Sequence, residues 1–415
     1  MKKFFALALA ATAVVACSKS ENGGNGDEPT PGQAQQLKVL TSINTKAVGK
    51  VGVVDGTVLP VGSAIGVMVT NEDGNADFTP TATGNGNADG DYYPNGRNVR
   101  FANEAGENTW ASVTEAGQTK LLLFSGEEKG KVYGYYPYNN DDNMVLGIGN
   151  ATTIPVKILN TGTIKVGDAD PETNNPEDPD ALAATDPTEI DFMYNTRNDV
   201  VGAKTTTTAK LEMQHALSRV SFRVYTSAEA QDAVQGDDKS YYQLVGYTIK
   251  NKSNGQTEGE LRAQFKYTAD ADASRMNIQT GNIANTIAGG EIVRTIEGYK
   301  MVKSEANDNT NNDAAADKSY RVSNLLFPLV PITEEDGKSK NIEVVFSIQR
   351  MNSDNSVASA PVGYALPFAI TDDSGSWEAG KNYTYTVKFT GNALSIETVT
   401  VTKWDEVVGG SMEIE

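Results

Sequence analysis

His215 is the only histidine of the chain and therefore the only imidazole available for acid–base or metal chemistry. A zinc site with two histidine ligands is excluded, and a Ser-His-Asp triad would have to use His215. The sequence contains neither a GxSxG elbow nor a GxxxxGK[ST] phosphate loop. Because His215 lies in a strand-like segment, we interpret it as a packed strand histidine with one satisfied ring nitrogen. The sequence predicts no catalytic residue, no cofactor and no enzymatic activity.

Cys17 is the only cysteine, so an intrachain disulfide is impossible. It follows a basic start at Lys2 and Lys3 and an apolar run from residue 4 to 13, which is too short to span a bilayer. The residues before it, Val14-Val15-Ala16, complete a pattern similar to a bacterial lipobox. We therefore predict that residues 1–17 are a lipoprotein signal peptide ending at a lipidated Cys17. The alternative is an ordinary signal peptide with an incidental cysteine.

An acidic, proline-rich stretch, residues 161–188, is predicted to be a surface loop. Its carboxylates are the best candidate ligands for Ca²⁺, which prefers oxygen. They are Asp168, Asp170, Glu172, Glu177, Asp178 and Asp180. The glycine and terminal glutamate of an EF-hand are missing, so we interpret these residues as solvated surface charge. No metal site is predicted, and Ca²⁺ binding by residues 168–180 is left open.

Four tyrosines cluster at Tyr133, Tyr135, Tyr136 and Tyr138 and could stack on sugars. Strand alternation places Tyr133 and Tyr135 on one face. We favour packing in the core and at the edge of a strand that stops at Pro137. A sugar platform is the alternative reading of the same residues.

Composition points to a β-rich chain with many turns. The 415 residues include 39 Gly and 15 Pro, and the net charge is −19. This charge disfavours nucleic acid as a partner, because it repels phosphate. Short apolar or alternating runs separated by turns are typical of β-sandwiches. Strands are predicted at 36–43, 64–69, 99–101, 120–124, 131–138, 241–249, 260–267, 325–330, 342–349 and 383–389, with a continuous apolar pattern over 211–224 and a short helix at 228–234.

The domain organisation follows from changes in composition. Residues 18–35 form a flexible tether rich in Gly, Asn and Pro. A Thr-rich connector at 204–209 marks the predicted boundary. The two predicted sandwich domains are therefore residues 36–208 and 209–415.

Several motifs together resemble the fimbrillins of Bacteroidales, the major and minor fimbrial subunits and fimbrillin-like lipoproteins. They occur in family order over nearly the whole chain. The motifs are the lipobox at Cys17, VYGYYPY at 132–138, DFMY at 191–194, LEMQHALSRVSF at 211–222, and WEAGKNYTY at 377–385 followed by residues 399–404.

The resemblance implies an all-β fold of two tandem transthyretin-like Greek-key β-sandwiches. It also implies a lipidated precursor at the outer membrane and assembly into a surface fimbria by donor-strand exchange. In that scheme a trypsin-like protease cuts behind the first strand, here about residues 36–43, and a neighbour's strand replaces it. The candidate cut sites are Lys46 and Lys50, where the family often has arginine, and the first arginine of this chain is Arg97.

The donor strand implied by the resemblance lies within residues 407–415. Gly409-Gly410 would be a hinge, and the apolar residues Val407, Val408, Met412 and Ile414 would include the groove plugs. The alternative is a frayed tail. The implied partners are copies of this chain or other fimbrial subunits, joined head to tail, and a host protein or glycan. A stalk subunit is our first reading. The alternatives are a tip or accessory adhesin, and a surface glycan-binding lipoprotein with Tyr135 or Trp110 facing solvent.

Overall fold

The computed structural model describes most of the chain from residue 34 to residue 404. The described residues are 34–43, 59–80, 93, 95–103, 110–114, 120–140, 152–167, 182–236, 239–251, 274–284, 291–304, 315, 318–328, 342–366 and 376–404. All structural statements below refer to them.

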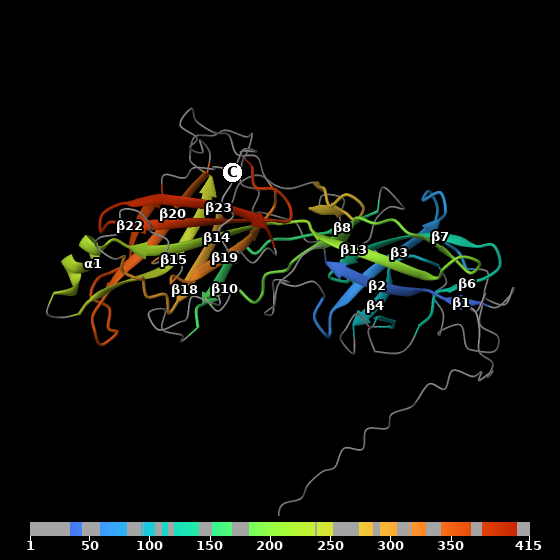
Figure 1. Cartoon of the computed structure of the whole chain (residues 1–415), viewed down its shortest axis with the longest axis horizontal. Coiled ribbons are helices and arrows are strands. Elements are labelled where there is room, and N and C mark those ends of the chain that lie inside the picture. The colour runs from blue at the N-terminus through green and yellow to red at the C-terminus, as the bar shows by residue number, and fades with distance from the viewer. Residues whose placement is uncertain are drawn as a thin grey trace, which may run out of the picture.

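The predicted all-β class is confirmed. The described residues form strands throughout, with one α-helix, α1 (Ala228–Gln235), close to the predicted 228–234. Ser227 begins this helix, and its side chain accepts a hydrogen bond from the backbone N–H of Ala230 at 3.1 Å, as an N-cap residue should. Two groups of strands lie side by side along the long axis of the molecule (Figure 1). The Greek-key, transthyretin-like detail stays a prediction.

The first group is built on an eight-stranded sheet in the order β2-β13-β11-β7-β3-β4-β5, with β12 paired to β7. Its strands are β2 (Lys38–Ile43), β3 (Ala64–Asn71), β4 (Val99–Asn103), β5 (Trp110–Ser112), β7 (Lys129–Tyr136), β11 (Met193–Asn195), β12 (Val200–Gly202) and β13 (Thr208–His215). A small sheet of β1 (Gln35–Gln36) and β6 (Leu123–Phe124) accompanies it. The central strand β3 is almost entirely buried, because its sequence AIGVMVTN is apolar on both faces.

A three-stranded sheet, β17-β16-β8, lies beside the eight-stranded sheet (Figure 1). Its strands are β8 (Thr153–Pro155), β16 (Arg275–Asn277) and β17 (Ile283–Ala284). A side chain at Gly281 would meet the ring of Tyr194 on β11 at 2.2 Å, so this hairpin rests directly on the first group. Residues from beyond position 209 therefore contribute to the N-terminal half of the molecule.

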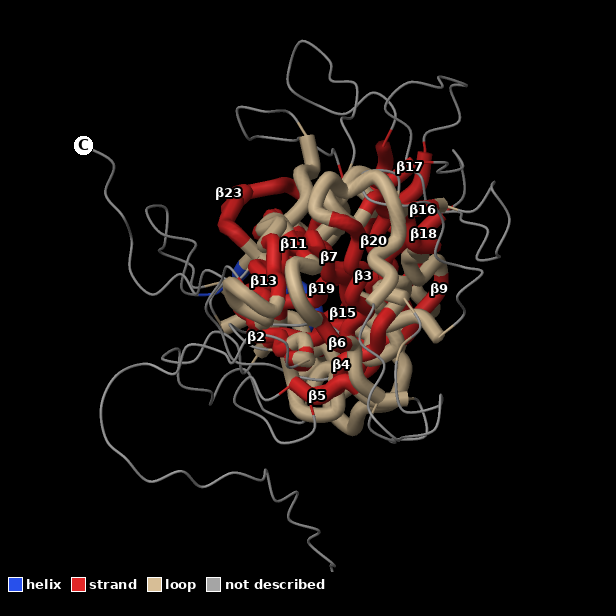
Figure 2. Tube along the Cα trace, turned by 90° about the vertical axis from the view of Figure 1, so that its right-hand side faces the viewer, coloured by secondary structure: helices blue, strands red, loops and turns tan. Residues whose placement is uncertain are grey.

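The second group consists of two five-stranded sheets, ordered β10-β19-β14-β22-β23 and β21-β20-β15-β18-β9. The first contains β10 (Ala183–Thr185), β14 (Ser218–Thr226), β19 (Arg321–Leu326), β22 (Lys381–Phe389) and β23 (Leu394–Lys403). The second contains β9 (Thr161–Lys165), β15 (Tyr241–Asn251), β18 (Glu291–Glu297), β20 (Ile342–Met351) and β21 (Val362–Leu366). Figure 2 shows the strands of both groups, in red, with the loops between them in tan.

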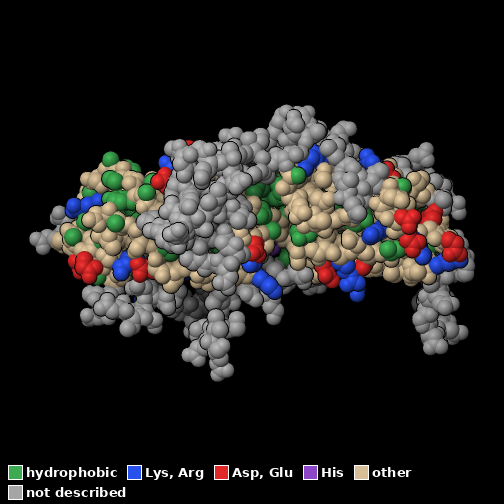
Figure 3. Space-filling model, turned by 90° about the horizontal axis from the view of Figure 1, so that it is seen from above, with side chains coloured by type: hydrophobic (Ala, Val, Ile, Leu, Met, Phe, Trp, Pro, Cys, Tyr) green, Lys and Arg blue, Asp and Glu red, His purple; other side chains and the backbone are tan. Residues whose placement is uncertain are grey.

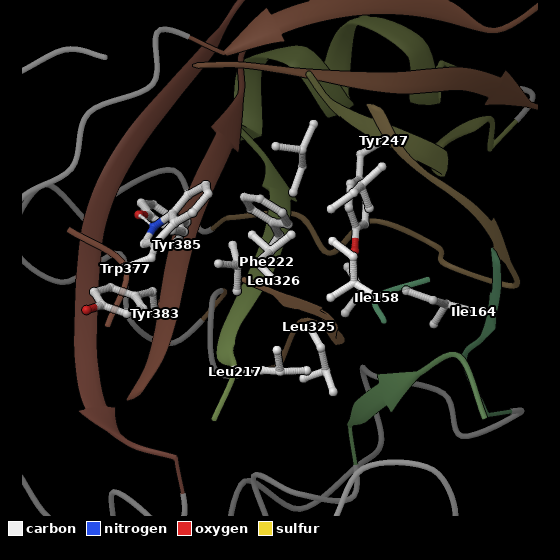
Figure 4. Close-up of a cluster of buried hydrophobic side chains, with 14 of the residues drawn as sticks. Ile158, Ile164, Leu217, Phe222, Tyr247, Leu325, Leu326, Trp377, Tyr383 and Tyr385 are labelled. Carbon is white, nitrogen blue, oxygen red and sulfur yellow. Dashed lines mark hydrogen bonds between the residues drawn. The ribbon is translucent and has the colours of Figure 1, made fainter. Parts of the chain in front are cut away.

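The core of the second group lies between its two five-stranded sheets. Phe222 on β14 contacts the rings of Tyr247 and Phe346 on the opposite sheet, each with ring centroids 5.1 Å apart. Tyr385 on the neighbouring β22 and Trp377 pack beside it (Figure 4). Burying each such side chain contributes about 1.5–3 kcal/mol, so this interior is a main source of stability.

The apolar pattern at 211–224 spans two strands of different groups. β13 ends at His215 in the eight-stranded sheet, and β14 begins at Ser218 in a five-stranded sheet. Both strands bury apolar side chains, so the apolar pattern runs through both of them and does not reveal the break between β13 and β14. The predicted division at 208/209 also disagrees with the pairing, since β9 and β10 precede it and yet pair with β18 and β19. β9 and β10 thus lie before position 209 but pair with strands that lie after it. The division into domains at 36–208 and 209–415 stays a prediction.

The predicted surface loop at 161–188 is wrong at both ends. β9 runs parallel to β18, and β10 runs parallel to β19. Tertiary pairing supplies the hydrogen bonds that make these residues strands, and local composition does not reveal it. The candidate calcium ligands at 168–180 lie outside the described residues.

A buried ion pair crosses the second group. Glu189 Oε1 accepts hydrogen bonds from Arg294 Nη2 at 2.5 Å and from the backbone N–H of Leu325 at 3.2 Å. Both side chains are almost completely buried, and Oε2 of Glu189 has no hydrogen-bond partner among the described residues. Burial, opposed by Arg294, raises the pKa of Glu189 from 4.5 to about 7.

This pKa predicts a pH-dependent stability. Between pH 4.5 and about 7 the folded protein holds a proton on Glu189 that the unfolded chain releases. The free energy of unfolding should therefore fall as the pH rises through this window, by at most about 1.4 kcal/mol per pH unit. Urea titrations at intervals across the window measure the slope. Glu189→Gln should lack this contribution and Glu72→Gln, at the surface, should keep it; equal slopes in all three proteins would contradict the assignment.

The surface carries charges of both signs. Acidic and basic side chains lie next to one another on the face seen in Figure 3. Lys129–Glu72 and Lys165–Glu297 form exposed ion pairs, with N–O distances of 3.0 and 3.1 Å. Each contributes at most about 1 kcal/mol. Within the described residues, no helix has the length and hydropathy that a membrane crossing requires.

Candidate functional site

The N-terminal strand β2 lies at one edge of the eight-stranded sheet. It pairs with β13 in a parallel register from Lys38↔Thr208 to Ile43↔Met213. The backbone N–H of Lys38 also donates to the carbonyl of Thr207 at 2.8 Å. The other strand pairs of this sheet are antiparallel. β2 is thus attached to the sheet through the backbone of a single neighbouring strand.

The side chains of β2 alternate between the interior and solvent, as its sequence predicts. Val39, Thr41 and Ile43 are at most 4% exposed, whereas Leu40 on the opposite face is 42% exposed. Leu37, just before the strand, is also buried, and its N–H donates to the carbonyl of Leu122 at 2.9 Å. Leu37, Val39 and Ile43 belong to the same core cluster as residues of β13. A short segment therefore completes both a hydrogen-bond ladder and a hydrophobic core.

The other flank of β2 faces β5, which is the opposite edge of the same sheet. Trp110 Nε1 donates to Thr41 Oγ1 at 2.9 Å. Gln36 Nε2 donates to Ser112 Oγ at 3.4 Å. The sheet curls so that side chains of β5 approach β2, as the nearby positions of the two strands in Figure 2 illustrate. β2 is consequently held by the backbone of β13 and by the Trp110–Thr41 bond, while β1, directly before it, pairs with β6 and contacts Ser112 through Gln36.

These contacts to β5 were not found by sequence reasoning. Trp110 and Thr41 are 69 positions apart, and Gln36 and Ser112 are 76 apart. The available signal is the hydroxyl of Thr41, a polar group on the otherwise apolar inward face. A buried hydroxyl requires a partner, although the sequence does not identify it.

The C-terminal end of the described chain meets the connection between β13 and β14. Trp404, the last described residue, stacks on His215 with ring centroids 4.2 Å apart. His215 Nδ1 lies 2.9 Å from Asp191 Oδ2. The guanidinium of Arg219 lies 5.9 Å from the Trp404 ring. His215, at the end of β13, and Arg219, in β14, therefore both lie beside Trp404 at the end of β23.

Backbone hydrogen bonds fix the same junction. The N–H of Trp404 donates to the carbonyl of Gly380, and the N–H of Gly380 donates to that of Leu217, each at 2.9 Å. The N–H of Ala216 donates to the carbonyl of Phe192 at 2.8 Å. Motifs that the sequence showed far apart, at 191–194, 211–222, 377–385 and 399–404, are thus brought together here.

His215 is a buried histidine of a strand, with one ring nitrogen bound to Asp191 at 3.0 Å, which confirms its interpretation. Burial and, secondarily, the charge of Asp191 raise the pKa of the nearby Tyr136 phenol above its usual range. The phenol is therefore neutral at physiological pH. Among the described residues, no group of three or more His, Cys, Asp or Glu side chains is placed to hold a metal ion.

The tyrosine cluster belongs to the core. Tyr133 and Tyr135 are fully buried, and Tyr135 Oη donates to Asn98 Oδ1 at 2.5 Å. A side chain at Gly66 on β3 would collide with the Tyr135 ring at 2.0 Å, so this position requires glycine. Core packing is confirmed, and the alternative with Tyr135 facing solvent is wrong. Trp110 is only partly exposed, and its Nε1 is bound to Thr41.

The remaining predicted sites lie outside the described residues. They are the lipidation site Cys17, the cut sites Lys46 and Lys50, and the donor residues Val407, Val408, Met412 and Ile414. The structure does place their neighbours in the sequence: β2 ends at Ile43 before the cut sites, and Trp404 precedes the donor segment.

A model of the family described as fimbrillin-like matches residues 53–404 of the chain, which leaves β2 outside the match. No curated protein matches the chain. Among solved structures, a proposed cell adhesion protein from Bacteroides ovatus is similar at 16% identity and a TM-score of 0.47, covering 90% of this chain and 98% of the other. A fimbrial protein from Bacteroides vulgatus is similar at 11% identity and a TM-score of 0.45, covering 89% and 99%.

Proposed function

The chain belongs to the fimbrillin-like family, and on that premise we propose that it is a subunit of a surface fimbria, assembled by donor-strand exchange. The strand that leaves is β2, together with the residues before it. Its replacement is a strand from a neighbouring subunit, either another copy of this chain or a different fimbrial subunit. The subunit takes a stalk position and acts by non-covalent polymerisation, without catalysing a reaction.

The observation that carries this proposal is the position of β2. It is an edge strand whose removal would strip a six-residue ladder from β13. It would also uncover the apolar side chains that pack against Val39 and Ile43. Unpaired backbone groups and wet apolar surface are both unfavourable, so a strand from another molecule would be stabilised in the vacated position.

A C-terminal donor supports a filament rather than a closed pair. The leaving strand belongs to the first group of sheets, whereas the chain reaches the predicted donor segment, residues 407–415, from Trp404. A contact between different surfaces of successive copies is head to tail, and it grows into a fibre when it does not close into a ring. Gly409-Gly410 would give this segment the backbone freedom to extend toward a neighbour.

Trypsin treatment of the purified full-length precursor should produce a ladder of multimers on a non-denaturing gel. Deletion of residues 407–415 should abolish the ladder, because the donor is then missing. Lys46→Gln combined with Lys50→Gln should also abolish it, while Lys38→Gln on β2 serves as the control that leaves the predicted cut sites intact. A ladder that persists after the deletion would exclude this donor, and a ladder from the double variant would exclude both cut sites.

We propose further that the precursor is anchored to the outer membrane through Cys17 before maturation. The supporting observation is the lipobox-like sequence directly before this cysteine. Several acyl chains, at about 0.8 kcal/mol per buried CH₂, would hold the precursor firmly. Cys17→Ala should lose labelling by radioactive palmitate and should leave the membrane fraction, whereas Ser18→Ala should keep both. Continued labelling of the Cys17→Ala protein would contradict lipidation.

A further inference from the structure

The two places where neighbouring subunits would pull on this chain lie close together. A neighbour's donor would bond along β13, which ends at His215, and the chain's own donor segment would begin after Trp404. The rings of His215 and Trp404 stack with centroids 4.2 Å apart. Tension in a fibre would therefore enter each subunit along β13 and leave it beside the end of the same strand.

The ladder that holds β23 is poorly oriented to resist such a pull. Arg219 pairs with Asn382, and Asn382 pairs with Thr402, so these residues form one row across β14, β22 and β23. β14 begins and β23 ends next to this row. A pull between the start of β14 and the end of β23 thus acts across the strands rather than along them. It would break the hydrogen bonds of β23 one after another, and each of them contributes little by itself.

A second set of contacts spans the junction without using this ladder. The N–H of Trp404 donates to the carbonyl of Gly380, and the N–H of Gly380 donates to that of Leu217, each at 2.9 Å. Gly380 has a φ of +71°, in the left-handed region that favours glycine. The indole of Trp404, which is 3% exposed, adds its stack on His215. These contacts join the end of β23 directly to the connection between β13 and β14.

We propose that Trp404 and Gly380 form a mechanical clamp, which carries the tension between successive subunits of a fibre past the β22–β23 ladder. This inference rests on the proposed function, because it concerns the donor that follows Trp404. The partners at both ends are other subunits of the same fibre. The contacts of the clamp are loaded together, whereas the ladder alone would be loaded one hydrogen bond at a time. The clamp therefore determines when β23 begins to peel from the sheet.

Single-molecule pulling of the full chain tests the clamp. Cys17→Ala combined with Lys210→Cys leaves one attachment point, on the exposed face of β13, and a handle after Glu415 supplies the other. Under constant load, Trp404→Ala should shorten the lifetime of the folded chain by about tenfold or more, because it removes contacts that oppose the first step. Trp404→Phe keeps a ring on His215 and should lie between. Val357→Ala, at an exposed side chain, is the matched control and should stay within about twofold of the unaltered chain.

A second pulling geometry separates load from stability. The C-terminal handle is replaced by Val357→Cys, in the second group of sheets beyond β20, so that the pull no longer acts through Trp404. Trp404→Ala should then shorten the lifetime several-fold less than it does with the C-terminal handle. If Trp404→Ala does not fold, Trp404→Phe and Gly380→Ala are compared in the same two geometries.

The outcomes distinguish this inference from the proposed function. Equal lifetimes of the Trp404→Ala and unaltered chains under the C-terminal pull overturn the clamp. Equal shortening in both geometries also overturns it, because Trp404 would then stabilise the fold without carrying load. Both results leave strand exchange intact, since the multimer ladder decides on that. A chain that shows the clamp and yet forms no ladder after trypsin treatment overturns the role of the clamp in a fibre together with the proposed function.

Discussion

Replacing Arg294 with methionine should lower the free energy of unfolding by about 3–5 kcal/mol at pH 8, because it leaves the carboxylate of Glu189 buried without its counter-charge. The substitution also removes the donor to the carbonyl of Leu159, at 2.9 Å. Urea unfolding followed by tryptophan fluorescence measures the change. The loss should be smaller at pH 5, where Glu189 is protonated.

The matched control is Lys165→Met, which breaks the pair with Glu297 on the same sheet. Both of those side chains are more than half exposed, so the free energy of unfolding should change by less than about 0.5 kcal/mol. Glu189→Leu combined with Arg294→Met should recover much of the stability, since no unpaired charge remains. A double variant as unstable as Arg294→Met alone would show that packing, rather than the unpaired carboxylate, causes the loss.

Trp404→Ala should lower the free energy of unfolding by about 3–5 kcal/mol through the cavity it leaves at the junction. The indole is 3% exposed and stacks on His215. It is the residue that holds the end of β23 against the connection between β13 and β14. Its loss should therefore raise amide hydrogen exchange in residues 399–404 as well as lower stability.

Trp404→Phe keeps an aromatic ring on His215 and should cost clearly less than Trp404→Ala. Val357→Ala, at a side chain that is 60% exposed, is the surface control and should stay within about 0.5 kcal/mol of the unaltered protein. A Trp404→Ala protein as stable as this control would mean that the stack does not hold the junction together.

The sequence predicted those strands whose own side chains alternate or form an apolar run. β2 alternates as expected, β3 is a buried run, and β15 and β20 lie where their patterns indicated. β9 and β10 escaped prediction because they are short and lie beside an acidic segment. Their strand conformation depends on parallel pairing with β18 and β19, more than 100 positions away. Local propensity carries little information about such pairing.

The site was predicted in part for the same reason. The strand predicted at 36–43 contains β2, and the strand interpretation of His215 was confirmed. Neither observation reveals that Trp110 approaches Thr41 or that Trp404 stacks on His215. Both contacts depend on how the sheets curl and pack, which is a tertiary property.

Amide hydrogen exchange of β13 tests the central proposal most directly. In the uncut precursor, the N–H groups of residues 208–215 that bond to β2 should be protected. They should exchange rapidly in a cut monomer that has lost β2, and they should be protected again in the multimer. If β13 stays protected in the cut monomer, or stays unprotected in the multimer, the vacant position is not filled by another subunit and the proposal is wrong.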